Sequence, residues 1–530
     1  MLRRVRRPME RMALLLLLPL AAGCSATVWR AQFIQPSEYH RVDPAVPFLK
    51  CHTEQGEVFV LDDWTVEEQE RRIAGTGVRY DRDRKEVARG ALSIPIQDVR
   101  LLETNEPRSV AKNHMVVLGV MTGVSLAVTA ACLANPKACF GSCPTFFALD
   151  EAGDLALQAE GFSASVARSL EATDVDALYT ARPEGRRFEL LMTNDALETH
   201  AVRSVRVLAA PRPEGGRVFR AGESFYPARL VLPPVECRSG QGDCLAAVGS
   251  VDALEYLSPA DPEYLAARET VELDFPFLEG STGIVIAGRN SLLNTYLFYQ
   301  VLAYMGLRAG DWLIELDRGD AKAIELASGV GRLLGAVEVS VQDRDGRWVP
   351  IGSFHEVGPI AREVQVVPIP PDVAAQLPSE RWRVRLTLAR GNWKIDFAGL
   401  AVLEPPVSPA AIPLADVTRG GHTEPEALRL LLDPDAYLVT YPGDAYTLHF
   451  ELPEGDSELF LESRGYYYEW MRREWLTEED QGLAARALAD PEATLRRLAP
   501  EYKKIEGRME EYFWKSRVDR RGLAVGGGAP

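Results

Sequence analysis

The stretch VEVSVQDRDGRWVPI, residues 337–351, alternates apolar and polar side chains before an acidic turn. Val337, Val339 and Val341 are each followed by a polar residue, which is the period of a half-buried β-strand. Residues 343–346, DRDG, then predict a hairpin turn, and the chain returns as a second strand. The same acidic turn resembles part of a calcium loop, but a hairpin requires the same residue types.

The same alternation continues in RWRVRLTLARGNWKIDF, residues 381–397. Its first half predicts a strand that ends at an Arg-Gly turn, residues 390–391. In the second half, three apolar residues are expected to face the core: Trp393, Ile395 and Phe397. The charged residues between them are expected on the opposite, exposed face: Lys394 and Asp396. Paired amphipathic strands in this order predict an antiparallel β-sandwich.

Residues 270–403, which contain these strands, resemble the galactose-binding-like jelly rolls, which often end on a strand of the W-x-I-D type. That resemblance implies a β-sandwich fold and leaves the ligand open. Residues 291–305, SLLNTYLFYQVLAYM, are apolar nearly all round and predict a buried helix.

The fold class expected for the chain is therefore mainly β and multidomain, made of antiparallel sandwiches or jelly rolls with a buried apolar helix and a helical C-terminal tail. The expected segments are a signal peptide (1–23), a tether (24–47), a small β module (48–106), an apolar helix (110–136), a β domain (137–269), the sandwich (270–403), a Pro-rich linker (404–424), a β extension (425–455), the helical tail (456–518) and a disordered end (519–530).

Two of these segments carry finer predictions. In the small β module the strands are expected near 57–61 and 91–96, with TVEEQERR between them as a loop or short helix. In the tail, helices are expected at 467–475, 481–488 and 490–498, with Asp490 as N-cap and a further helix opened by Pro500.

The N-terminus has the layout of a secretory signal: five arginines before Met12, an apolar run, then small residues ending at Cys24. LAAGC, residues 20–24, resembles the lipobox of bacterial lipoproteins, although its leucine lies four residues before the cysteine rather than three. The resemblance implies lipidation of Cys24 and anchoring in the cell envelope, with Ser25 favouring the outer membrane. Ordinary secretion with a free Cys24 is the alternative.

Charge excludes some classes of partner. The chain has a formal charge of −17, and removal of residues 1–23 makes it four units more negative. A protein this acidic is poorly suited to bind nucleic acid or anionic lipid headgroups. Neither a cofactor nor a metal site is expected.

The cysteines fit an oxidising compartment. Two close pairs predict local disulfides: Cys237 with Cys244, and Cys139 with Cys143. Cys51 and Cys132 are left over without evidence for their pairing. A zinc site is less favoured, because no histidine lies beside either close pair at ligand spacing.

The uncharged stretch 115–134, MVVLGVMTGVSLAVTAACLA, is long enough to span a bilayer and carries small residues at every fourth position. A single span would place the rest of the chain in the reducing cytoplasm. A buried or membrane-hugging helix is therefore preferred to a span.

No catalytic motif stands out in the sequence. Glu171, Asp174 and Asp176 lie close together, but without a glycine turn they are more typical of a solvated loop than of a calcium site. His200, near Glu198, is more typical of a structural histidine.

Residues 140–515 resemble a family of uncharacterised bacterial envelope lipoproteins. The stretches that carry the resemblance are GSCPT (141–145), TND…ET (near 194), GPIA (358–361), WKID (393–396) and SRGYY (463–467). The resemblance implies architecture and no mechanism.

Three functions follow as hypotheses. The preferred one is a lipid-anchored, non-catalytic binding or scaffold protein whose partner is an envelope protein or a glycan. The second is a hydrolase of an envelope polymer that uses a carboxylate pair, drawn from acids such as Asp174, Asp396 or Glu462. The third is an assembly subunit that docks through residues 115–134.

Overall fold

The computed structural model describes residues 26–34, 36–42, 46, 48–53, 57–81, 86–110, 144–196, 198–252, 254–355, 358–469 and 479–509. These residues belong to two compact units, which divide between Asn135 and Pro136. Cys24, Cys132, Cys139, Cys143 and the apolar stretch 115–134 lie outside the described residues. None of the described helices is long and apolar enough to cross a membrane.

The N-terminal unit is one antiparallel sheet in the order β1-β6-β2-β3-β4-β5. Its strands are β1 (Ala26–Ile34), β2 (Leu49–Thr53), β3 (Val58–Glu67), β4 (Arg72–Tyr80), β5 (Glu86–Pro95) and β6 (Val99–Val110). The predicted tether is wrong over residues 26–34, because β1 pairs with β6 along its whole length. The predicted loop TVEEQERR is wrong in its first half, since Thr65 still pairs with Ala74 in β3 and β4.

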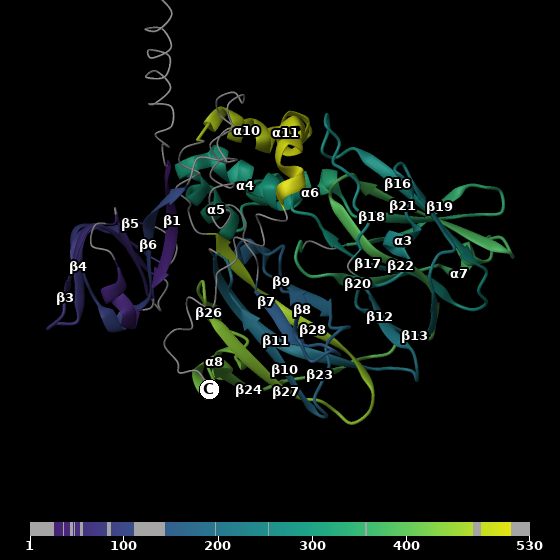
Figure 1. Cartoon of the computed structure of the whole chain (residues 1–530), viewed down its shortest axis with the longest axis horizontal. Helices are drawn as coiled ribbons and strands as arrows, with labels where there is room; N and C mark the ends of the chain where they lie inside the picture. The colour runs from purple at the N-terminus through teal and green to yellow at the C-terminus, as the bar shows by residue number, and fades with distance from the viewer. Residues whose placement is uncertain are drawn as a thin grey trace, which may run out of the picture. The chain divides into compact units, whose positions relative to one another are not determined.

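The larger unit begins with a sandwich of two sheets, which we call the sandwich module (Figure 1). One sheet contains β25 (His422–Thr423), β24 (Leu414–Arg419), β27 (Ala445–Glu451), β10 (Arg187–Thr193), β7 (Thr145–Leu149) and β8 (Leu155–Glu160). The other contains β23 (Ala410–Ile412), β11 (Glu198–Pro211), β28 (Ser457–Glu469) and β9 (Ala172–Ala177), with β26 (Leu438–Thr440) beside β11. Apolar residues of both sheets, such as Leu190, Val207, Leu448 and Leu461, form one buried core.

The second part of this unit, the barrel module, holds the predicted sandwich strands. A closed barrel contains β12 (Arg217–Ala221), β13 (Ser224–Leu232), β22 (Trp393–Leu403), β17 (Thr282–Asn290) and β20 (Glu363–Pro368). A six-stranded sheet packs on it, with β15 (Gly242–Asp243), β14 (Glu236–Ser239), β16 (Arg268–Pro276), β21 (Arg381–Ala389), β18 (Val337–Gln342) and β19 (Trp348–Phe354). The mainly β, multidomain fold class is thereby confirmed.

The hairpin predicted at 337–351 is present. Strands β18 and β19 pair, and the turn between them is closed by Asp343, whose carboxylate accepts a hydrogen bond from the Arg347 amide at 2.8 Å. The Asp343 side chain therefore stabilises the hairpin turn. Val337, Val339 and Val341 are fully buried, as the alternation predicts.

The pattern of β22 is only partly as predicted. Trp393 and Ile395 face the six-stranded sheet, but a β-bulge at Asp396 shifts the register, and Phe397 packs inside the barrel instead. Lys394 and Asp396 are buried and not exposed, at 7% and 0% relative accessibility. The reason is that β22 is covered on both faces, so each charge is buried with a partner of opposite sign.

Helices cover one end of the larger unit. The buried helix predicted at 291–305 is α4 (Leu293–Met305), followed by α5 (Ala309–Asp317) and α6 (Ala321–Leu334). Figure 1 shows the C-terminal helices α10 (Gln481–Ala489) and α11 (Pro491–Ile505) beside α4 and α6. Among the described residues, three short helices lie elsewhere: α3 (Leu245–Val248), α7 (Pro371–Ala374) and α8 (Pro425–Leu432).

The C-terminal predictions have mixed outcomes. Asp490 caps α11 as predicted and accepts a hydrogen bond from the Ala493 amide at 3.0 Å. Pro500 opens no new helix, because α11 continues through it. Residues 457–469 form β28, not helix, since that strand completes a sheet with β11 and β9. Residues 410–423, predicted as linker, form three short strands that extend both sheets of the sandwich module.

The predicted disulfide between Cys237 and Cys244 is present and buried. It ties β14 to the start of α3. Cys51 is a buried free thiol in the N-terminal unit, and burial raises its pKa to about 12.

Candidate functional site

A cavity of about 490 Å³ lies where the sandwich module meets the barrel module. Edge strand β9 and the segment before it supply one wall, and β12, β19 and β20 supply the other. The volume is that of a small-molecule site, and junctions between modules are common places for such sites.

The two modules are held together around this cavity by buried polar contacts. The Ala177 amide donates to the Glu363 carboxylate at 3.0 Å, and the Ile360 amide donates to the Glu160 carboxylate at 2.9 Å. The Tyr179 hydroxyl donates to the Val218 carbonyl at 2.6 Å. These contacts fix the two walls relative to each other.

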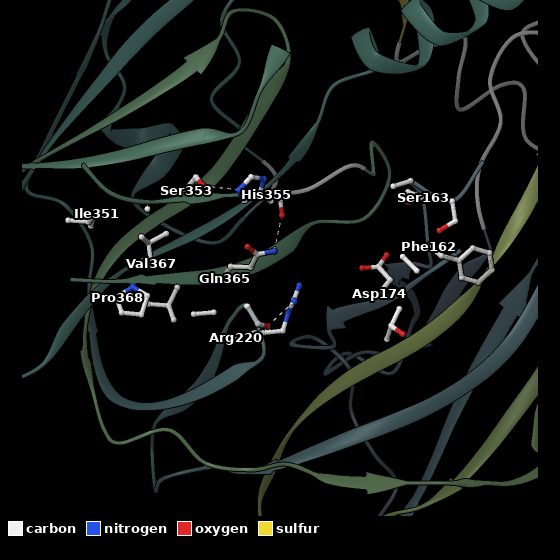
Figure 2. Close-up of a pocket in the computed structure, with 18 residues that line it drawn as sticks. Phe162, Ser163, Asp174, Arg220, Ile351, Ser353, His355, Gln365, Val367 and Pro368 are labelled. Atoms are coloured by element: carbon white, nitrogen blue, oxygen red, sulfur yellow. Dashed lines mark hydrogen bonds between the residues drawn. The ribbon is translucent and has the colours of Figure 1, made fainter. Parts of the chain in front are cut away.

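Arg220 is the cation of the cavity. It comes from the end of β12, and its side chain is 18% exposed. One terminal nitrogen lies 3.6 Å from the Glu363 carboxylate, and another donates to the Gly222 carbonyl at 3.2 Å. Its Nε is buried and has no hydrogen-bond partner within the described part of the chain. Figure 2 shows the guanidinium lying between Gln365 and Asp174.

Asp174 faces Arg220 from β9, with its carboxylate directed into the cavity (Figure 2). Burial raises the pKa of Asp174, while Arg220 and the amides of Val175 and Phe162 act in the opposite direction. The group is therefore both a hydrogen-bond acceptor and an acid that holds its proton more firmly than an exposed aspartic acid.

The remaining polar groups come from β19, β20 and the residue after β19. Ser353 and the His355 ring nitrogen Nε2 are hydrogen-bonded at 2.7 Å, and the Gln365 amide donates to the His355 carbonyl at 2.8 Å. Apolar residues complete the lining: Ile351, Val366, Val367 and Pro368. The lining thus combines donors and acceptors with an apolar surface.

The acids weighed from the sequence are not brought together. Asp174 lines the cavity, whereas Asp396 and Glu462 do not. Asp396 is paired with Arg362, and Glu462 is paired with Arg206. Glu171 does not join Asp174 in a metal site, because it is paired with Arg203 and Arg464. His200 is fully buried and hydrogen-bonded to Glu198 at 3.0 Å.

Sequence reasoning missed Arg220, Glu363, His355 and Gln365. The one local signal is Glu363, an acid placed at the start of the apolar strand EVQVVP. An acid in a strand that is otherwise buried requires a partner, which the sequence does not identify.

No protein-family profile matches the chain, and no curated protein matches it in sequence. Among solved structures, an exo-β-1,3-galactanase of Phanerochaete chrysosporium with β-1,3-galactotriose aligns at 11% identity over 66% of this chain and 65% of that one, with a TM-score of 0.15. The chain thus spans slightly less than two thirds of the galactanase. The secreted serine protease VesC of Vibrio cholerae aligns at 5% identity over 71% of this chain and 99% of that one, with a TM-score of 0.14. Likenesses this weak carry no argument about function.

Proposed function

We propose that this protein is a lipid-anchored component of the cell envelope that binds a small, neutral, polyhydroxylated ligand, such as a sugar unit of an envelope glycan, in the cavity between the two modules. The observation that carries the ligand class is the balance of charge in the cavity wall. One guanidinium of the wall, Arg220, is accompanied by the carboxyl group of Asp174 in the wall and by the buried carboxyl group of Glu363 behind it.

A site without excess positive charge does not favour a phosphate or a polyanion. The polar groups of the lining include a strong donor at Arg220, an acceptor at Asp174 and groups that both donate and accept at Ser353 and Gln365. Sugar hydroxyls both donate and accept, and the C–H faces of a sugar can pack on apolar side chains such as Ile351 and Val367.

Binding is expected to depend on Arg220. In isothermal titrations of the chain with D-galactose, D-glucose or N-acetyl-D-glucosamine, Arg220→Gln should weaken the affinity at least about tenfold, since a hydrogen bond from a charged donor contributes about 1.5–3 kcal/mol. Arg229→Gln is the matched control, because Arg229 is an exposed, ion-paired arginine on the neighbouring strand β13. Equal affinities of the two variants, or absence of binding by the unaltered chain, would contradict the proposal.

The anchor rests on the lipobox at Cys24. Cys24→Ser is expected to move the protein from the membrane fraction to the soluble fraction and to abolish labelling by a fatty-acid analogue, because stable anchoring requires the acyl chains. Fractionation of cells that express each form measures this. A Cys24→Ser protein that stays with the membrane would instead implicate residues 115–134 as a second anchor.

A second candidate function is hydrolysis of a glycan, and the raised pKa of Asp174 favours it. A partly buried acid that faces a cavity and has a raised pKa can donate a proton to a leaving group. Turnover of p-nitrophenyl glycosides, lost in Asp174→Asn while sugar binding persists, would support the hydrolase over the binding protein.

A further inference from the structure

Glu363 is a buried carboxyl group directly behind Arg220. It lies at the first position of β20, is 2% exposed and does not line the cavity itself. One carboxylate oxygen accepts a hydrogen bond from the Ala177 amide at 3.0 Å, and the other lies 3.6 Å from the Arg220 guanidinium. Since β12 and β20 pair at Arg220 and Gln365, the backbone fixes Glu363 within reach of Arg220.

Other charged groups surround the pair. Asp174 faces Arg220 from β9, so that the guanidinium has a carboxyl group on two sides. Tyr179 packs near Glu363, and its pKa is raised well above the usual value by burial and by the charges of Glu458 and Glu363, so it remains neutral. Glu458 is itself paired with Arg217 at 2.8 Å. His355 is the remaining titratable group of the cavity.

We propose that Glu363 is the positioning residue of this site: its carboxylate holds the Arg220 guanidinium against the barrel wall and so leaves Asp174 open to the ligand. This inference rests on the proposed function. When Glu363 is neutral, Asp174 is the counter-charge that remains for Arg220. The guanidinium then turns toward Asp174. Arg220 and Asp174 form an ion pair with each other, and neither is free to hydrogen-bond the ligand.

The pair makes ligand affinity depend on pH in the neutral range. Burial raises the pKa of Glu363 from 4.5 to about 7, against the opposing effect of Arg220. In the folded protein Glu363 is therefore ionised above about pH 7 and protonated below it. Affinity is expected to be highest near pH 8 and to fall about tenfold by pH 6, as the carboxylate that holds Arg220 is lost.

The ligand-dependent test uses the sugar that binds most tightly among D-galactose, D-glucose and N-acetyl-D-glucosamine. Glu363→Gln should bind about tenfold more weakly at pH 8 and show little change between pH 6 and 8. Glu458→Gln is the matched control, because it also removes a buried, ion-paired carboxylate beside Tyr179 and should keep the pH profile. His355→Gln should keep it as well. A Glu363→Gln protein with unaltered affinity and pH profile, or a profile that disappears in His355→Gln, would overturn the inference.

A second measurement needs no ligand and separates this inference from the proposed function. In crystal structures at pH 8, the Arg220 guanidinium of Glu363→Gln should lie within hydrogen-bond distance of Asp174, whereas in Glu458→Gln it should remain beside Glu363. An unmoved guanidinium in Glu363→Gln would refute the positioning role whatever the sugars do. A moved guanidinium in a protein that binds none of the sugars would uphold the positioning role and refute the ligand class.

Discussion

Trp393→Ala is expected to lower the free energy of unfolding of the barrel module by about 3–5 kcal/mol, the usual cost of truncating a buried tryptophan. Trp393 is 2% exposed and belongs to the core between the barrel and the six-stranded sheet. Its ring meets Phe354 edge to face, with centroids 5.7 Å apart. Because β17 pairs with β22 up to Trp393 and holds its backbone in place, the cavity left by truncation cannot collapse fully.

Two variants make this result specific. Trp393→Phe should cost less than about 1.5 kcal/mol, because it keeps most of the ring and loses an Nε1 that has no hydrogen-bond partner among the described residues. Glu338→Ala, on the exposed face of β18, should change stability by no more than about 0.5 kcal/mol. Urea denaturation followed by tryptophan fluorescence and circular dichroism measures all three. Equal small effects of Trp393→Ala and Glu338→Ala would mean that Trp393 is not a core residue.

Arg362→Met is expected to cost about 3–5 kcal/mol, since it leaves a buried carboxylate without its cation. Asp396 is 0% exposed and is paired with Arg362. Its carboxylate also accepts a hydrogen bond from the Asp252 amide at 3.3 Å. Burial already raises the pKa of Asp396 although Arg362 opposes the shift. Loss of Arg362 raises that pKa further, so the destabilisation should be smaller at pH 5 than at pH 7, where protonation of Asp396 is harder.

The double variant Arg362→Met with Asp396→Asn tests the cause. If the cost comes from the unpaired charge, the double variant should recover much of the stability lost in Arg362→Met, as measured by urea denaturation at pH 7. A double variant that is as unstable as the sum of the two single variants would show that the two side chains act independently. Pairing with Arg362 would then not be what allows Asp396 to be buried.

Trp393 and Asp396, both in β22, show what the alternation of a single strand predicts and what it does not. The alternation in 393–397 correctly predicts that Trp393 and Ile395 are buried. It wrongly predicts that Lys394 and Asp396 are exposed. Alternation along a strand shows which residues share a face, but it does not show whether other segments cover the second face. Coverage of that face depends on segments from elsewhere in the chain, among them Glu255 and Arg362.

Local chemistry determined several features without the tertiary structure. The turn at 343–346 follows from its acidic residues and glycine, and Gly391 in the second turn has φ +74°, a conformation that favours glycine. The cap at Asp490 and the disulfide between Cys237 and Cys244 depend on residues at most seven positions apart. Interactions over such short separations can be predicted because the connecting chain leaves few alternatives.

Only the tertiary structure decided the membership of the sheets and the composition of the site. Strands β21 and β22 are consecutive in sequence but belong to different sheets. Strand β28 pairs with β11, although the sequence between them makes up more than half of the larger unit. Asp174, Arg220 and Glu363 converge because β9, β12 and β20 meet at the junction of two modules. A carboxylate pattern in one segment says nothing of the cation that another segment supplies, since long-range packing alone determines which charges become neighbours.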